Sequence, residues 1–251
     1  MDSLQKLRRQ VALLWAGLVL VAVAWIGTEL RRTGRGGPVP PVVRVERLEV
    51  VEPTGELAIV LANSERPAVA TVDGQQLMAG QEEERRGRPS IIFFDGQGDE
   101  VGGMLFGTVE TEDGYSAARH FSLDAYEQDQ TVVLHHYQSP AGSSSGLTVS
   151  DRPPISIAES LAELGLALGA SRDELNAAVA AMPEEGREAR LRELFGTARA
   201  FVGSGPDGAA NLTLRDGEGR PRIVIEAPAS GEAAIQILDE AGEPVLRLPS
   251  G

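Results

Sequence analysis

The sequence Leu212–Ile225, LTLRDGEGRPRIVI, and the sequence Ile235–Leu248, IQILDEAGEPVLRL, are two copies of one pattern. In each copy, apolar residues alternate with others on both sides of a short turn, and a proline stands two residues after the last glycine of the turn. Alternation places apolar side chains on one face of a β-strand. The two copies therefore predict antiparallel β-hairpins at the C-terminal end of the chain.

An acidic residue followed three residues later by glycine marks four such turns: Glu52–Gly55, Asp95–Gly98, Asp216–Gly219 and Asp239–Gly242. The acidic residue can accept hydrogen bonds from N–H groups two residues on, and glycine adopts φ > 0 at the end of a type I turn with a bulge. A calcium loop is the alternative, but it needs alternating oxygen ligands and a closing glutamate, which these turns lack. We interpret them as hairpin turns.

Strand patterns also occupy the chain upstream, from Val42. Ser90–Phe94 (SIIFF) is a continuous apolar run, which predicts a strand buried on both faces. In the strand pattern TVVLHHY, the neighbouring residues His135 and His136 should point to opposite faces. Residues 42–153 are therefore predicted to form a β-rich domain, and residues 204–251 to form C-terminal β-hairpin repeats.

Between these β regions, residues 154–203 have a helical pattern and are predicted to be an insertion. A first helix is expected over Ile157–Leu168, rich in Ala, Leu and Glu. Ser171 and Glu174 form a capping box for a second helix to Met182, and a third helix is expected from Pro183 to Val202. The predicted fold class is mainly β, an antiparallel hairpin meander with an inserted helical segment, preceded by one transmembrane helix.

The transmembrane prediction rests on the uncharged run Val11–Gly27, VALLWAGLVLVAVAWIG. Seventeen helical residues rise about 25 Å, close to the hydrocarbon thickness of about 30 Å. We expect a basic tail at 1–10, a transmembrane helix at 11–30 and a Gly/Pro linker at 31–41. Ala22-Val23-Ala24 matches a signal-peptidase site, but we favour a retained anchor because the apolar run continues beyond it.

Flanking charge does not orient this anchor, because three basic residues precede it and three follow it. These residues are Lys6, Arg8, Arg9, Arg31, Arg32 and Arg35. Long domains cross membranes largely regardless of charge. We expect a single-pass protein of a bacterial inner membrane with its C-terminal domain outside the cytoplasm.

Composition excludes some partners. After Gly36 the chain has 17 arginines and 35 acidic residues, a net charge of −18, so it would repel nucleic acid. There is no cysteine, which excludes disulfides and thiolate metal sites. High arginine, alanine and glycine content suggests a bacterial source, where the glycosylation sequon Asn211-Leu212-Thr213 has no expected role.

Candidate catalytic residues are few. Gly142–Gly146 (GSSSG) matches the G-x-S-x-G pattern, but we expect it in a loop between strands, and all three histidines precede it. The densest polar cluster contains His120, Asp124, Glu127, Asp129, His135 and His136. Adjacent histidines on one strand cannot easily bind one metal, and Ser122–Gln130 is better interpreted as a capped turn. No catalytic, cofactor-binding or metal site is assigned.

Four stretches carry a family resemblance: VERLEVVEPTGELAIVLANSERP, SIIFFDGQGDEVGGMLFG, FSLDAYEQDQTVVLHHY and GLTVSDRP. Together with the last forty residues, they resemble an uncharacterised family of bacterial proteins with one N-terminal transmembrane segment and a β-rich body ending in D-x-x-G-x-P repeats. The resemblance implies the anchor and the β fold, and it implies no site residue.

Two functions remain open. The first is a membrane-tethered, non-enzymatic binding or assembly module, whose partner is another protein or another copy of the chain. The alternative is a membrane-anchored hydrolase or metal-dependent enzyme that uses the region from His120 to His136.

Overall fold

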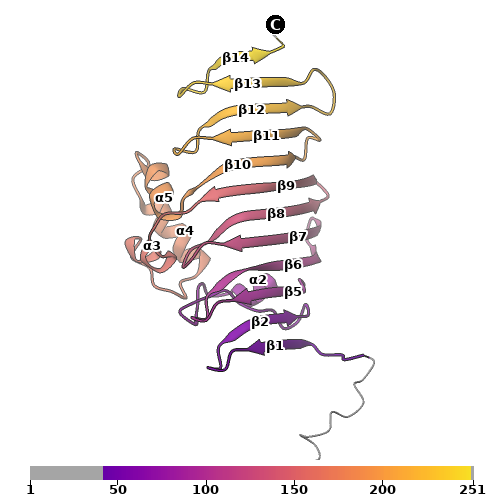
Figure 1. The fold of residues 1–251 in the computed structure, drawn as a ribbon, viewed down its shortest axis with the longest axis vertical. Coiled ribbons are helices and arrows are strands. Elements are labelled where there is room, and N and C mark those ends of the chain that lie inside the picture. Colours follow the sequence, from indigo (N-terminus) through magenta and orange to yellow (C-terminus); the bar gives the residue numbers. More distant parts are fainter. Residues whose placement is uncertain (1–41, 250–251) are drawn as a thin grey trace, which may run out of the picture. The chain divides into compact units, whose positions relative to one another are not determined.

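The computed structural model describes residues 42–249 (Figure 1). The predicted tail at 1–10, anchor at 11–30 and linker at 31–41 lie outside the described residues. Within the described part, no helix has the length and apolar character needed to span a bilayer.

Twelve strands form one antiparallel sheet in which spatial order follows chain order, as the predicted meander requires (Figure 1). The strands of this sheet are β1 (Arg47–Val51), β2 (Leu57–Ala62), β5 (Ser90–Phe94), β6 (Glu100–Thr111), β7 (Gly114–Asp124), β8 (Gln130–Ser139), β9 (Gly142–Asp151), β10 (Thr197–Ser204), β11 (Ala210–Arg215), β12 (Pro221–Ala227), β13 (Ala234–Leu238) and β14 (Pro244–Leu248). The mainly β fold is thereby confirmed.

Two longer connections interrupt the meander. Residues 63–89 join β2 to β5 and contain the short hairpin of β3 (Thr71–Val72) and β4 (Gln75–Gln76), followed by α2 (Gln81–Arg85). Residues 152–196 join β9 to β10 and contain α3 (Ile157–Glu163), α4 (Arg172–Ala181) and α5 (Arg187–Phe195). In Figure 1 the three helices α3–α5 gather at one end of the strands, beside the middle of the sheet.

The four predicted turns are confirmed. In each, the glycine N–H donates to the carbonyl of the acidic residue three positions earlier, at 2.9–3.2 Å, and the glycine has a positive φ of 75–105°. The strand register shifts next to each turn, at the expected bulge. Local turn chemistry therefore sets the register of these hairpins.

One face of the sheet carries two unbroken rows of apolar residues, two per strand, which we call the apolar rows. The first row is Leu48, Leu61, Ile91, Met104, Phe121, Leu134, Leu147, Val202, Leu212, Ile225, Ile235 and Leu248. The second row is Val50, Ile59, Phe93, Gly102, Leu123, Val132, Val149, Ala200, Leu214, Ile223, Ile237 and Leu246. The register thus aligns apolar positions across all twelve strands.

The opposite face is mixed and is covered only in part. Its residues Val60, Ala62, Ile92 and Phe94 are buried together with Ala68, which belongs to the connection 63–89. The prediction that β5 is buried on both faces is wrong, because Phe93, on the apolar rows, is 38% exposed. Among the residues that the structure describes, a covering layer meets only one face of β5.

The helical insertion forms with different bounds. Ser171 and Glu174 make the predicted capping box of α4. The third helix is shorter than predicted: α5 ends at Phe195, and the next residues form β10. Gly196 takes φ 77°, and an added Cβ there would lie 2.0 Å from the Asp151 carbonyl oxygen, so the chain turns sharply back onto β9. The sheet therefore resumes at Thr197, within the predicted insertion 154–203.

Candidate functional site

The histidines of the predicted polar cluster divide between the two faces of the sheet. His120 on β7 stands directly opposite His135 on β8, and both belong to the opposite face. His136 points to the face of the apolar rows, where its Nδ1 lies 2.6 Å from Ser145 Oγ. The expectation that His135 and His136 face apart is confirmed, so only two of the three histidines lie together.

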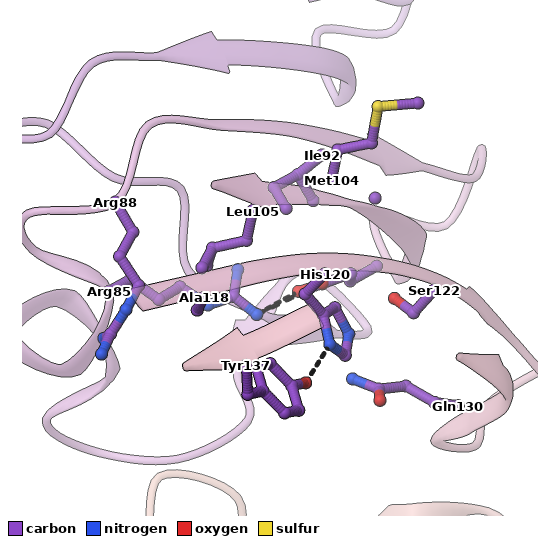
Figure 2. A pocket seen from close by; sticks show the side chains of 12 residues that line it. Arg85, Arg88, Ile92, Met104, Leu105, Ala118, His120, Ser122, Gln130 and Tyr137 are labelled. Atoms are coloured by element: carbon purple, nitrogen blue, oxygen red, sulfur yellow. Dashed lines mark hydrogen bonds and ion pairs between the residues drawn. The ribbon is translucent and has the colours of Figure 1, made fainter. Parts of the chain in front are cut away.

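His120 and His135 belong to an aromatic cluster on the opposite face. His120 Nδ1 shares a hydrogen bond of 2.6 Å with Tyr137 Oη (Figure 2). The His135 ring stacks on Tyr137 at a centroid distance of 4.7 Å and on Phe201 at 6.3 Å. Burial lowers the pKa of both histidines, and each is lowered further by a neighbouring histidine. Both shifts favour the neutral form of the imidazole.

A pocket of about 250 Å³ opens beside His120, between β6, β7 and the connection that carries α2 (Figure 2). Its polar lining includes Arg85, Glu100, His120, Ser122, Gln130 and Tyr137. Arg85 Nη2 donates to Glu100 at 2.9 Å to Oε2 and 3.2 Å to Oε1. Burial raises the pKa of Glu100, and Arg85 opposes that rise. The pocket wall is thus an ion pair next to neutral aromatic groups.

A second cavity of about 360 Å³ lies where the strands end against the helices, and it shares Arg85, Glu100 and Gln130 with the first. Its apolar lining comes from α3, α4 and α5, through Leu161, Leu175 and Phe195, and from the connection 63–89, through Val72, Leu77 and Met78. The two pockets together make one region of mixed polar and apolar lining between the sheet and its covering segments.

Asp124 is the most perturbed acid of this region. Burial raises its pKa to about 7, and the charges of Glu100 and Asp129 add to the rise. Among the described residues, Asp124 Oδ1 has no hydrogen-bond partner. An acid of this kind holds a proton near neutral pH, and it could exchange that proton with a small polar ligand.

The remaining acids of the predicted cluster, Glu127 and Asp129, make contacts that hold the helical insertion to the sheet. Asp129 Oδ2 lies 3.6 Å from Arg152 Nη2, and Arg152 also donates 2.6 Å to the Phe195 carbonyl oxygen. Glu127 has φ 51°, and its carbonyl accepts the N–H of Ile157 at 2.8 Å. The turn between β7 and β8, predicted as a capped turn, therefore anchors the helical insertion.

No group of three or more His, Cys, Asp or Glu residues within 42–249 is placed to hold a metal ion. Gly142–Gly146 is not the predicted loop, because it forms the first half of β9. Its serines alternate between the two faces, and Ser144 Oγ lies 3.2 Å from His135 Nε2. A nucleophile elbow places its serine at a sharp turn from a strand into a helix. Gly142–Gly146 provides no such turn, because β9 continues beyond it to Asp151.

Sequence reasoning missed Arg85, Glu100 and Tyr137 as lining residues. Tyr137 stands two residues after His135, and the strand alternation correctly places both on one face, but it does not reveal a pocket there. Arg85 lies at the end of the short acidic helix α2, and Glu100 is the first residue of β6. No local sequence pattern predicts that these two side chains meet. Only the return of the chain from α2 to β6 brings the two side chains together.

The apolar rows are the second candidate surface. Fourteen of their side chains are 37–55% exposed, and of the ten other positions only Gly102 is buried. A shallow apolar hollow of about 700 Å³ lies on this face, lined by Leu134, Leu147, Val202, Leu212 and Ile225 among others. An antiparallel sheet in water normally turns its apolar face toward a core. Within the described residues no second layer meets this face.

Comparison with protein-family models and with curated proteins gives no match for this chain.

Proposed function

We propose that the chain is a membrane-tethered, non-enzymatic binding or assembly module, which binds through the face that carries the apolar rows. One observation carries the proposal: twenty-three of the twenty-four row positions bear an apolar side chain, the other is Gly102, and fourteen are at least 37% exposed. Soluble monomers rarely expose a contiguous apolar patch larger than a few hundred Å². A face of this extent is suited to a partner surface.

The composition of the two faces supports this choice. Adjacent residues on β12 illustrate the contrast, since Ile225 lies on the apolar rows and Glu226 on the opposite face. The opposite face mixes Thr, Arg and Glu side chains with its apolar positions, as a solvated face does. The apolar rows contain no polar or charged side chain that would need to be desolvated on binding.

Photo-crosslinking tests the proposal with a matched pair of positions. Benzoylphenylalanine replaces Ile225 in one full-length variant and Glu226 in the other, and each is irradiated in intact membranes. We expect adducts from position 225 and few from position 226, because the two side chains leave the same strand on opposite faces. Equal labelling at both positions, or no adduct from position 225, would refute a binding role for this face.

The tether is part of the same proposal, with the uncharged run Val11–Gly27 as its support. We place the protein in a bacterial inner membrane with the sheet outside the cytoplasm. A reporter enzyme active only outside the cytoplasm, fused after Gly251, is expected to be active. A cytoplasmic reporter fused at the same residue would then be silent, and the reverse pattern would contradict this orientation.

A second candidate is a membrane-anchored hydrolase or metal-dependent enzyme in the His120 pocket. It is favoured by the His120 imidazole in that pocket and by the raised pKa of Asp124 in the adjoining cavity. The discriminating measurement is the metal content and hydrolytic activity of wild type, His120→Ala and Asp129→Ala. Metal-free protein with no activity that either substitution changes would eliminate this candidate.

A further inference from the structure

We propose that the occupant of the apolar rows is a second copy of this chain, packed face to face so that two sheets form one β-sandwich. The inference rests on the proposed binding role of this face and names the partner. It starts from three properties of the rows: their length, their area and their self-complementarity.

The length of the rows restricts the partner. Twelve strands spaced 4.7–4.9 Å apart span about 53 Å, and each strand contributes two positions. An occupant that covers both rows from end to end must therefore present an equally long apolar surface about two side chains wide. A helix docked across the strands would need roughly 35 residues at 1.5 Å each. The sheet of a second copy has the required length by construction.

The area is sufficient for a stable dimer. Fourteen side chains that expose 37–55% of their surface leave on the order of 1,000 Å² of apolar surface on each copy. One partner in a standard specific interface contributes about 800 Å². The face thus provides enough apolar surface for a dimer without help from the rest of the chain.

Self-complementarity follows from the uniform register. A two-fold axis lying between the sheets, along the strand direction, places the rows of one copy over the same rows of the other. Two sheets about 10 Å apart interdigitate their inner side chains, as in a β-sandwich. The net negative charge of the chain does not oppose this contact directly, because the rows themselves carry no charge.

Within residues 42–249, no second layer covers the face of the apolar rows. The main buried cluster is confined to β2, β5 and Ala68, and of the segment 204–249 only Ala209 and Ala234 are buried apolar residues. Domains generally need two packed layers around a core, and open sheets rarely exceed about ten strands alone. The C-terminal strands would acquire their core from the partner copy.

Cysteine crosslinking tests this arrangement in the full-length chain, which has no cysteine of its own. The rows are centred between β8 and β9, so Leu134→Cys should lie near the two-fold axis, and Thr148→Cys on the opposite face is the control. Because sheets packed face to face hold facing Cα atoms too far apart for a direct disulfide, a short bismaleimide joins the two cysteines instead. We expect it to produce a two-copy band in intact membranes from Leu134→Cys and little from Thr148→Cys. Equal bands from both variants would overturn the face-to-face arrangement.

Native mass spectrometry of the full-length wild type, released in detergent, measures the number of copies in the assembly without any substitution. We expect a mass of two copies for wild type and Thr148→Lys, and of one copy for Leu134→Lys. A one-copy wild type whose position 225 crosslinks another protein, or that retains bound phospholipid, would overturn the proposal and leave the binding role of the face intact. A one-copy wild type with no adduct at position 225 would overturn both.

Discussion

Arg85 Nη2 lies 2.9 Å from Glu100 Oε2, and this ion pair joins α2 to the first residue of β6. The side chains of Arg85 and Glu100 are only 19% and 10% exposed. Arg85 Nη1 also donates 3.0 Å to the carbonyl of Ala68, within the main buried cluster. The connection 63–89 is thus fastened to the sheet at the edge of the pocket.

Replacing Arg85 with Met is expected to lower the free energy of unfolding by about 3 kcal/mol, because it leaves the Glu100 carboxylate buried without its partner. Glu100→Gln in the same chain should recover most of that loss. Arg190→Met, which breaks the exposed pairs of Arg190 with Glu163 and Glu193, is the control and should lower the free energy of unfolding much less. Urea denaturation measures all four proteins, and equal losses for Arg85→Met and Arg190→Met would contradict the assignment.

Asp124 should make stability fall as pH rises from about 4 to 7. Its pKa is about 7 in the folded chain and 3.8 in the unfolded reference, so the folded state holds the proton over this range and the unfolded state does not. The contribution of protonated Asp124 to the free energy of unfolding is fully present below pH 4 and is lost as pH rises through 7. Ionisation of Asp124 in the folded chain lowers that free energy by roughly 2–4 kcal/mol. Asp124→Asn is expected to be more stable than wild type at pH 8, with a flatter profile.

The matched comparison for Asp124 is Asp129→Asn, because Asp129 is half exposed and faces Arg152. Thermal unfolding at pH 4, 6 and 8 compares wild type with the two variants. The assignment of the titration to Asp124 is wrong if Asp129→Asn flattens the profile and Asp124→Asn does not.

Two glycines should respond differently to alanine. A Cβ on Gly203 would lie 2.1 Å from the carbonyl oxygen of Ser145 on the neighbouring strand, whereas a Cβ on Gly217 would meet nothing within 4 Å. Gly203→Ala is expected to cost at least about 2 kcal/mol, and Gly217→Ala to lie within about 1 kcal/mol of wild type. Denaturant midpoints of the two variants measure the difference. Similar midpoints would show that β9 and β10 can separate enough to admit a methyl group.

Calcium should not stabilise the Asp216–Gly219 turn. Asp216 Oδ1 accepts the N–H groups of Glu218 and Arg220 at 3.0 Å, and Oδ2 accepts Arg220 Nε at 2.9 Å. Its carboxylate is therefore engaged within the turn. Addition of calcium is expected to change the Tm by less than about 1 °C, while Asp216→Ala lowers the Tm with or without calcium, as loss of a backbone cap does. A calcium-dependent rise in Tm that Asp216→Ala abolishes would restore the calcium-loop interpretation.

Local chemistry made the hairpins and helix starts predictable. Asp239 and Gly242 specify their turn within four residues, and Ser171 with Glu174 specifies the start of α4, so sequence alone identifies both. The end of α5 was not predictable in the same way. The pattern Leu191, Leu194, Phe195 continues to Ala198 by helical spacing, but Gly196 reverses the chain because β10 must pair with β9.

The pocket was only half predictable. His120 and His135 come from strands that alternation identifies, but Arg85 reaches the pocket from a connection whose path depends on packing over Val60 and Ile92. The exposure of the apolar rows also depends on packing between segments distant in sequence, so it was not predictable either. Alternation places Ile235 and Ile237 on one face, and it does not reveal whether another layer covers that face. The absence of a covering layer within the described residues is a property of the whole sheet.

The strand order of this sheet bears on how the chain folds as it leaves the ribosome. Every strand after β1 adds to an edge that has already been synthesised, and all of the sheet's pairings join strands that follow one another in it. Most of the pairing is therefore local in sequence, which favours rapid folding in spite of the all-antiparallel architecture. The connections 63–89 and 152–196 are exceptions to this local pairing. While each is being synthesised, the preceding strand, β2 or β9, is an unpaired edge because its next partner has not yet been made. A translational pause after either connection would lengthen the exposure of that edge, so these are the points at which a nascent chain is most vulnerable to pairing with the wrong strand.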